Sequence, residues 1–196
     1  MKKLMMMAVM VVTALTANAQ NTQHEIGSIS IQPKVGIAMG DIAGDYTYNN
    51  EKAKMRFALT AGVEGEYYAN AWLGVSLGAN YDQQGWKIDG QTTKLDYLNI
   101  PILANFYVTE GLALKTGIQP GFLLNSKVDG QDFNDVVRKD PETFNFAIPL
   151  GISYEYKNFV LDARTNFSLT KVCKLSEEDN WRSDLVVLTI GYKFSL

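Results

Sequence analysis

The stretch Asp184–Leu196, DLVVLTIGYKFSL, alternates between two kinds of side chain. One set is apolar throughout: Val186, Leu188, Ile190, Tyr192, Phe194 and Leu196. The other set also holds small and polar residues: Leu185, Val187, Thr189, Gly191, Lys193 and Ser195. Because strand side chains point alternately to two faces, this period of two predicts a β-strand with one continuous apolar face. Soluble domains usually end in polar, frayed residues, so we expect the apolar face of this strand to meet lipid.

Seven further runs alternate in the same way, and helical periodicity fits none of them as well. They begin near Ile29, Met55, Leu73, Leu98, Leu112, Phe144 and Phe159. Tight connections at 68–71, 109–111 and 157–158 alternate with long polar ones at 41–54, 84–93, 126–143 and 171–183. Short turns at one end and long loops at the other predict an all-β fold, an eight-stranded antiparallel up-and-down transmembrane β-barrel.

The distribution of apolar residues separates a membrane barrel from a soluble one. A soluble barrel that encloses a ligand has an apolar interior and a charged exterior. Here one face is aliphatic, and the other carries Gly, Ser, Asn and charges. Aromatic residues fall near the short turns (Tyr67, Phe106, Tyr156, Phe159, Phe194) and near the long loops (Tyr81, Phe122, Phe144, Phe167). Two such belts match the two interfaces of a membrane.

The first residues have the pattern of a secretory signal peptide. Lys2 and Lys3 precede an apolar run, and Ala17-Asn18-Ala19 is a small-x-small cleavage motif. A membrane anchor is the alternative, although the apolar run is short for one. Without the signal the chain has 16 basic and 21 acidic residues, and a net charge of −5 argues against nucleic acid as a partner. We expect a signal peptide at 1–19 cleaved near Ala19, a periplasmic segment at 20–27 and the barrel domain at 28–196.

Nine charged residues fall on inward-facing positions. They are the bases Lys34, Arg56, Lys115, Arg164 and Lys193 and the acids Glu64, Glu66, Glu155 and Asp162. Eight strands leave an interior just wide enough for side chains, so this near-balance predicts a structural ion-pair network in a filled lumen. Arg164 and Asp162 neighbour each other on one strand and cannot pair across the lumen. We therefore expect Arg164 and Arg56 to reach Glu64, Glu66 or Glu155. A proton or ion path along these charges is the functional alternative.

Three prolines fall inside predicted strands: Pro101, Pro120 and Pro149. Proline donates no hydrogen bond, and a closed barrel has no edge strand to hold it. We expect an interrupted ladder with a local bulge or kink where the prolines come level.

Two of the long connections repeat a pentapeptide, Lys87-Ile-Asp-Gly-Gln91 and Lys127-Val-Asp-Gly-Gln131. An Asp-Gly pair suits a tight hairpin turn, because both central residues of a type I′ turn need positive φ. We interpret the repeats as turns, with a ligand role for these loops as the alternative.

The residues give no indication of an enzyme. His24 is the only histidine and lies in the expected periplasmic segment, and Cys173 is the only cysteine and has no histidine near it. A barrel hydrolase usually carries a histidine-based constellation at the loop side. Asp129, Asp132, Asp135 and Asp140 match no EF-hand spacing, so we interpret them as a solvated acidic loop, with a contact to Ca²⁺ as the alternative. We expect no catalytic residue, cofactor or metal.

Three stretches resemble the PorT-like outer-membrane β-barrel family, often labelled "porin family": Tyr97–Leu103 (YLNIPIL), Gly117–Leu124 (GIQPGFLL) and Ile190–Phe194 (IGYKF). The resemblance covers essentially the whole chain after the signal. It implies assembly into the outer membrane of a Gram-negative cell by the barrel-insertion machinery, with outer-membrane lipids around the barrel.

We expect a monomeric, non-enzymatic barrel that contributes to envelope structure or binds an unknown ligand through its loops. A small solute or ion pore, a secretion-associated barrel as in some relatives, and a barrel enzyme with an unrecognised site remain alternatives.

Overall fold

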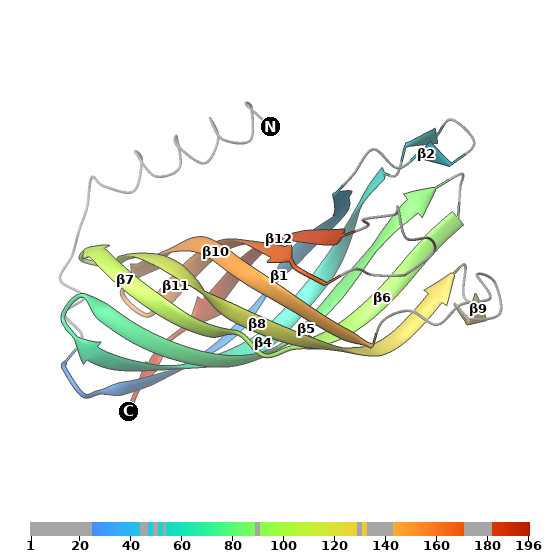
Figure 1. The fold of residues 1–196 in the computed structure, drawn as a ribbon. Helices are drawn as coiled ribbons and strands as arrows, with labels where there is room; N and C mark the ends of the chain where they lie inside the picture. The colour runs from blue at the N-terminus through green and yellow to red at the C-terminus, as the bar shows by residue number, and fades with distance from the viewer. Residues whose placement is uncertain are drawn as a thin grey trace.

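The computed structural model describes residues 25–43, 47–48, 51–52, 54–88, 91–128, 131–132, 143–170 and 182–196. These residues form strands throughout (Figure 1). The strands are β1 (Ile29–Ala43), β2 (Thr47–Tyr48), β3 (Glu51–Lys52), β4 (Lys54–Asn70), β5 (Leu73–Ile88), β6 (Gln91–Asn99), β7 (Ile102–Thr109), β8 (Leu112–Val128), β9 (Gln131–Asp132), β10 (Phe144–Tyr156), β11 (Phe159–Ser168), β12 (Arg182–Tyr192) and β13 (Phe194–Ser195). His24 and Cys173 lie outside the described residues.

The barrel wall is made of eight antiparallel strands, as the alternation predicted. In order around the wall they are β1, β4, β5, β6 with β7, β8, β10, β11, and β12 with β13. β12 and β13 pair with β1 and thereby close the ring. β6 and β7 are two halves of the fourth wall strand, separated only by Ile100 and Pro101. No helix in the described part of the chain is long and apolar enough to span a membrane.

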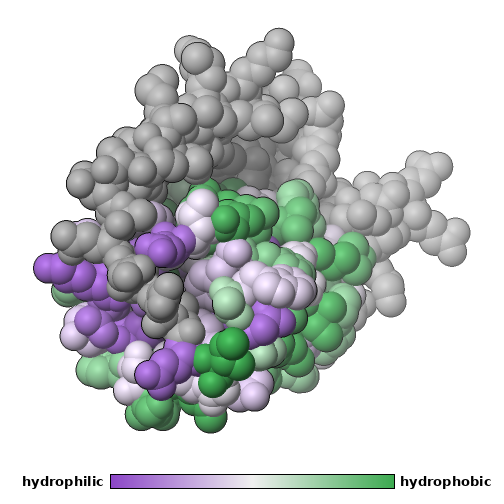
Figure 2. Space-filling model, turned by 90° about the vertical axis from the view of Figure 1, so that its left-hand side faces the viewer, coloured by the Kyte–Doolittle hydropathy of each residue, from purple (hydrophilic) through white to green (hydrophobic). Residues whose placement is uncertain are grey.

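The two faces of the wall divide as expected. Exposed apolar side chains line the outer face of every wall strand, for example Ile37, Leu59, Leu77 and Ile190. The aromatic residues assigned to the two belts are all exposed, from 37% at Phe106 to 55% at Phe159. Figure 2 views the end with the short turns, where hydrophilic residues lie mainly on the left-hand side and hydrophobic ones along the lower and right-hand rim.

The prediction of a long connection at 84–93 is wrong. β5 and β6 stay paired as far as Ile88 and Gln91, which leaves only two residues between them. The apolar alternation stops near Tyr81, but backbone pairing beyond the membrane does not need it. Val128 and Gln131 pair in the same way between β8 and β9. Both repeated pentapeptides therefore span two-residue hairpins, although the Asp-Gly residues themselves lie outside the described part.

The hydrogen-bond ladder is interrupted at the prolines, as expected, but no bulge occurs there. β6 ends at Asn99 and β7 begins at Ile102, yet Asn99↔Gly121 and Ile102↔Ile118 keep one register across Pro101. The Pro101 carbonyl still accepts a hydrogen bond of 2.9 Å from Gly78 N–H, so only the donor side is lost. The register shift between β6 and β8 lies instead between Asp96 and Tyr97.

Candidate functional site

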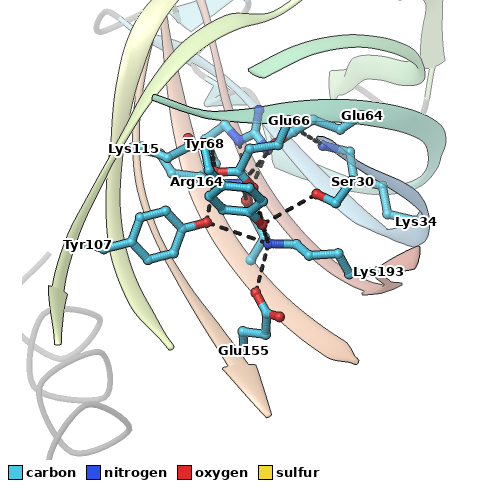
Figure 3. A network of polar contacts seen from close by, with 12 residues as sticks. Ser30, Lys34, Glu64, Glu66, Tyr68, Tyr107, Lys115, Glu155, Arg164 and Lys193 are labelled. Carbon is cyan, nitrogen blue, oxygen red and sulfur yellow. Dashed lines mark hydrogen bonds and ion pairs between the residues drawn. The ribbon is translucent and has the colours of Figure 1, made fainter. Parts of the chain in front are cut away.

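The charged side chains predicted to face inward meet in the lumen (Figure 3). They come from β1, β4, β8, β10 and β11 and from the residue between β12 and β13. Successive side chains of a strand point to opposite faces, so each of these residues points inward while the residues directly before and after it in the chain point to lipid. The side chains that form ion pairs are at most 6% exposed.

Glu64 on β4 is the centre of the first cluster. Its carboxylate forms ion pairs with Lys34 of β1, with Lys115 Nζ at 2.9 Å and with Arg164 Nη2 at 3.4 Å. Lys115 also contacts Asp162 of β11 at 2.9 Å. Three bases thus share two carboxylates, and their contacts join strands on different sides of the barrel.

One contact of Arg164 in this cluster was expected and one was not. Arg164 reaches Glu64, as expected from its inward position. It also pairs with Asp162 on its own strand, through Nη2 at 3.0 Å and Nε at 3.2 Å. Residues two apart on a strand share a face, and the long guanidinium side chain can bend along the strand to its neighbour. The side chain of Arg56 lies outside the described part, so its pairing stays a prediction.

Lys193 is the centre of a second cluster toward the short-turn end. Its ammonium contacts Glu155 at 2.7 Å and Glu66 at 3.1 Å, and it donates to Tyr68 Oη at 2.9 Å. Tyr107 and Asn105 each donate a 2.7 Å hydrogen bond to Glu66. The predicted lumen network did not include Tyr68 and Tyr107, because it contained charged residues only. The period-two alternation of their strands does place both tyrosines on the inward face.

Asp82 on β5 is a further buried acid that the sequence interpretation missed. It accepts hydrogen bonds from Thr60 and, at 2.5 Å, from Asn99. The alternation of β5 places it inward, two residues after Asn80, but the apolar run that predicted this strand ended at Tyr81. With Asp82 the described lumen holds four buried bases, Lys34, Lys115, Arg164 and Lys193, and five buried acids, Glu64, Glu66, Asp82, Glu155 and Asp162.

Little space is left between the first cluster and Asp82. A cavity of about 10 Å³ is lined by Lys34, Asp82 and Arg164, by neutral polar residues and by Val187. Four buried atoms among its lining residues lack a hydrogen-bond partner within the described chain: Arg164 Nη1, Asn80 Oδ1, Asn166 Oδ1 and Thr189 Oγ1. This volume matches a single water molecule, which would satisfy such atoms. The lumen at this level is therefore occupied by side chains.

The contacts of this arrangement can stabilise the charges that are buried in the lumen. Each buried carboxylate already faces a base or several hydrogen-bond donors, which offsets the several kcal/mol that an unpaired buried charge costs. Within the described residues, no three His, Cys, Asp or Glu side chains are grouped so as to hold a metal ion.

The fold and its polar lumen define a small transmembrane β-barrel protein of the outer-membrane class. A family model described as "Outer membrane protein beta-barrel domain" matches residues 18–174. The chain belongs to this family of outer-membrane proteins. No curated protein matches the chain.

Solved structures agree on the fold. The attachment invasion locus protein Ail of Yersinia pestis has a TM-score of 0.52 at 19% identity, covering 87% of this chain and 100% of that one. Neisserial surface protein A has a TM-score of 0.52 at 16% identity, covering 85% and 97%. Identities this low show the shared fold alone.

Proposed function

We propose that this protein is a non-enzymatic, PorT-like outer-membrane barrel with a filled lumen. In this proposal it contributes to envelope structure or binds a partner through its surface loops. The observation that carries the proposal is the threefold pairing of Glu64 with Lys34, Lys115 and Arg164. These contacts cross the lumen and leave a cavity of only about 10 Å³ beside them.

A selective pore is the main alternative, and the charge distribution argues against it. Ion-selective pores carry rings of one charge sign that passing ions meet through water. Here bases and acids alternate and contact each other directly, so an ion would have to break buried pairs. Breaking a buried pair by removing one partner typically costs about 3–5 kcal/mol.

The surroundings of the barrel follow from its outer face. Apolar side chains are exposed on every wall strand, which supports a lipid-surrounded monomer inserted by the barrel-assembly machinery. The proposal includes cleavage of a signal peptide near Ala19 and no nucleic-acid partner. A secretion-associated role, as in some PorT-like barrels, would act through the loops and leave the lumen closed.

A liposome-swelling assay tests the proposal. Vesicles containing the purified barrel are diluted into isotonic solutions of a pentose or a disaccharide, with a large porin as positive control. We expect the vesicles to swell no faster than protein-free ones. Rapid swelling in the pentose would overturn the filled lumen and favour a pore. Release of fatty acids from outer-membrane lipids by the same preparation would contradict the absence of enzymatic activity.

A further inference from the structure

Gly65 on β4 forms a notch in the outer face of the barrel. The positions around it on that face carry large exposed side chains: Val63 and Tyr67 along β4, Ile31 opposite on β1 and Leu77 opposite on β5. Gly65 itself has no side chain, and a Cβ built there would have no atom nearer than 3.9 Å. The wall is therefore hollowed at this one position, on the side that faces lipid.

The notch belongs to a groove of about 400 Å³, a size within the range of roughly 300–1,000 Å³ that ligand pockets have. Its outward lining residues form two adjacent rows of paired positions: Ile29, Tyr67 and Val75 in one row, and Gly65, Leu77 and Ile102 in the other. Glu66 and Ser76 also line the groove, but both are buried with inward positions, so their backbone forms its floor. None of these described lining residues presents a charge to the outer face, so the groove suits an apolar occupant.

The groove runs obliquely from the periplasmic interface into the membrane. Ile29 is the first residue of β1, and Tyr67 belongs to the aromatic belt near the short turns. At the other end of the groove, β7 runs from Ile102 to Thr109, which places Ile102 roughly 16–18 Å from the short turn at the usual rise and tilt. The apolar band of such barrels is about 25 Å tall, so the groove reaches from the interface to about the middle of the bilayer.

We propose that this groove binds one acyl chain of a phospholipid of the periplasmic leaflet. The path of the groove from the interface to mid-membrane is the path of such a chain. The groove is also continuous with the outer face that meets lipid, so a chain enters it without leaving the membrane. Tyr67 lies at the interfacial end, where the ring of a tyrosine can cover the chain while its hydroxyl meets the polar ester groups of the lipid.

Shape is what distinguishes this chain from the other lipids around the barrel. Lipid tails are as apolar as the side chains of the wall, so van der Waals packing has to favour the bound chain. In the groove a chain contacts side chains on both sides and the backbone floor, whereas on the convex wall elsewhere it contacts one side only. The floor belongs to the β1–β4 and β4–β5 ladders, whose backbone groups pair with each other and need no water.

A second copy of the barrel is the other occupant to consider. Two convex barrels touch along a narrow line, whereas a stable protein interface buries about 1,200–2,000 Å². A notch that lacks only the side chain of Gly65 is wide enough for a hydrocarbon chain and adds little area to a contact between barrels. The geometry therefore favours lipid over a partner barrel.

Photolabelling of the full-length barrel in phospholipid vesicles tests the proposal. The vesicles contain phosphatidylethanolamine with a photoactivatable diazirine on one acyl chain, and mass spectrometry locates the labelled residues. We expect more labelling at Val75 and Leu77 than at Leu161 and Ile190, which are exposed, paired outer-face positions of β11 and β12. The comparison is matched in height, because Val75 and Leu161 are each the third residue of a strand that follows a short turn.

Filling the notch should remove this excess. Gly65→Leu places a side chain in the groove, so labelling at Val75 and Leu77 should fall to the level of the comparison positions. Ala61→Leu is the matched control, because Ala61 is exposed on the same face of β4 but does not line the groove. A heat-modifiability gel reports whether each variant assembles. Gly65→Ala, whose methyl group fits without a clash, should reduce the excess even if Gly65→Leu fails to assemble.

The source of the chain is tested in asymmetric vesicles. With the diazirine lipid only in the leaflet at the short-turn end the excess should persist, and with the lipid only in the leaflet at the loop end it should vanish. Equal labelling of the two regions in wild type, or an excess that survives in Gly65→Leu, would overturn the proposal. So would a stable wild-type dimer that Gly65→Leu dissociates, since a second copy would then occupy the groove.

Discussion

Replacing Glu64 by glutamine removes one buried negative charge and keeps the shape of the side chain. Lys34, Lys115 and Arg164 would then share Asp162 and the more distant Asp82. At an effective dielectric of about 20, one ion pair at about 3 Å contributes roughly 5 kcal/mol before desolvation is counted. Measured losses for a broken buried pair are about 3–5 kcal/mol, and Glu64 has three cationic partners. We therefore expect Glu64→Gln to lower the free energy of unfolding by about 3–5 kcal/mol.

The assay for Glu64→Gln is urea unfolding in phospholipid vesicles, followed by tryptophan fluorescence and by the mobility of the unheated protein on gels. With a slope of roughly 2 kcal/mol per molar urea, the midpoint should fall by about 2 M. Glu25→Gln, at an exposed position ahead of β1, is the control and should change stability by less than about 0.5 kcal/mol.

A charge-balanced double variant sharpens this test. Among the described contacts, Lys34 forms its ion pair with Glu64. Lys34→Met therefore removes the cation that would lose its ion-pair partner in Glu64→Gln. Glu64→Gln with Lys34→Met should cost about 1–3 kcal/mol less than the sum of the two single changes. Wild-type stability for Glu64→Gln, or strict additivity in the double variant, would refute the view that Glu64 holds the lumen together.

Further predictions concern the outer face, the glycines and the leader. Leu77→Arg, 59% exposed near mid-membrane, should cost about 2–4 kcal/mol in the same unfolding assay, whereas Val108→Arg near the short turn should cost at most about 1 kcal/mol. Gly117→Ala should block assembly in a heat-modifiability gel, because its Cβ would overlap the Ile102 carbonyl of the next strand. Gly65→Ala, with 3.9 Å to its nearest neighbours, should assemble normally. N-terminal sequencing of protein from the outer membrane should begin at Gln20, and an intact Met1 would contradict signal cleavage.

The period-two pattern was sufficient to predict the fold and the two faces. Within the membrane each residue must satisfy either lipid or lumen, so the pattern of Leu73, Val75 and Leu77 against Gly74, Ser76 and Gly78 is read directly from the chain. Outside the membrane this constraint ends. Strands β5 and β6 continue there as a paired hairpin through Gln84 and Thr93, and apolar alternation could not reveal that.

The composition of the lumen network was predictable, but its partners were only partly so. Inward positions identified Glu64, Lys115 and Lys193, since those follow from strand parity. Which base meets which acid depends on the stagger between strands and on side-chain bending, neither of which a single sequence specifies. This is why the Arg164–Asp162 pair was missed. The sequence also could not show that the register continues past Pro101 without a bulge. Proline removes only one hydrogen-bond donor from the ladder, and the Pro101 carbonyl still accepts a hydrogen bond from Gly78 N–H.

Single-channel recording of the purified barrel in a planar bilayer tests the central claim most directly, because it reports any continuous path for ions past the pairs of Glu64 and Lys193. The account predicts no stable openings in wild type at moderate voltage and salt. It also predicts that shortening Glu64, Lys115 and Arg164 together to alanine produces openings, since this removes the side chains that cross the lumen. Large, long-lived openings of the wild-type protein would contradict it.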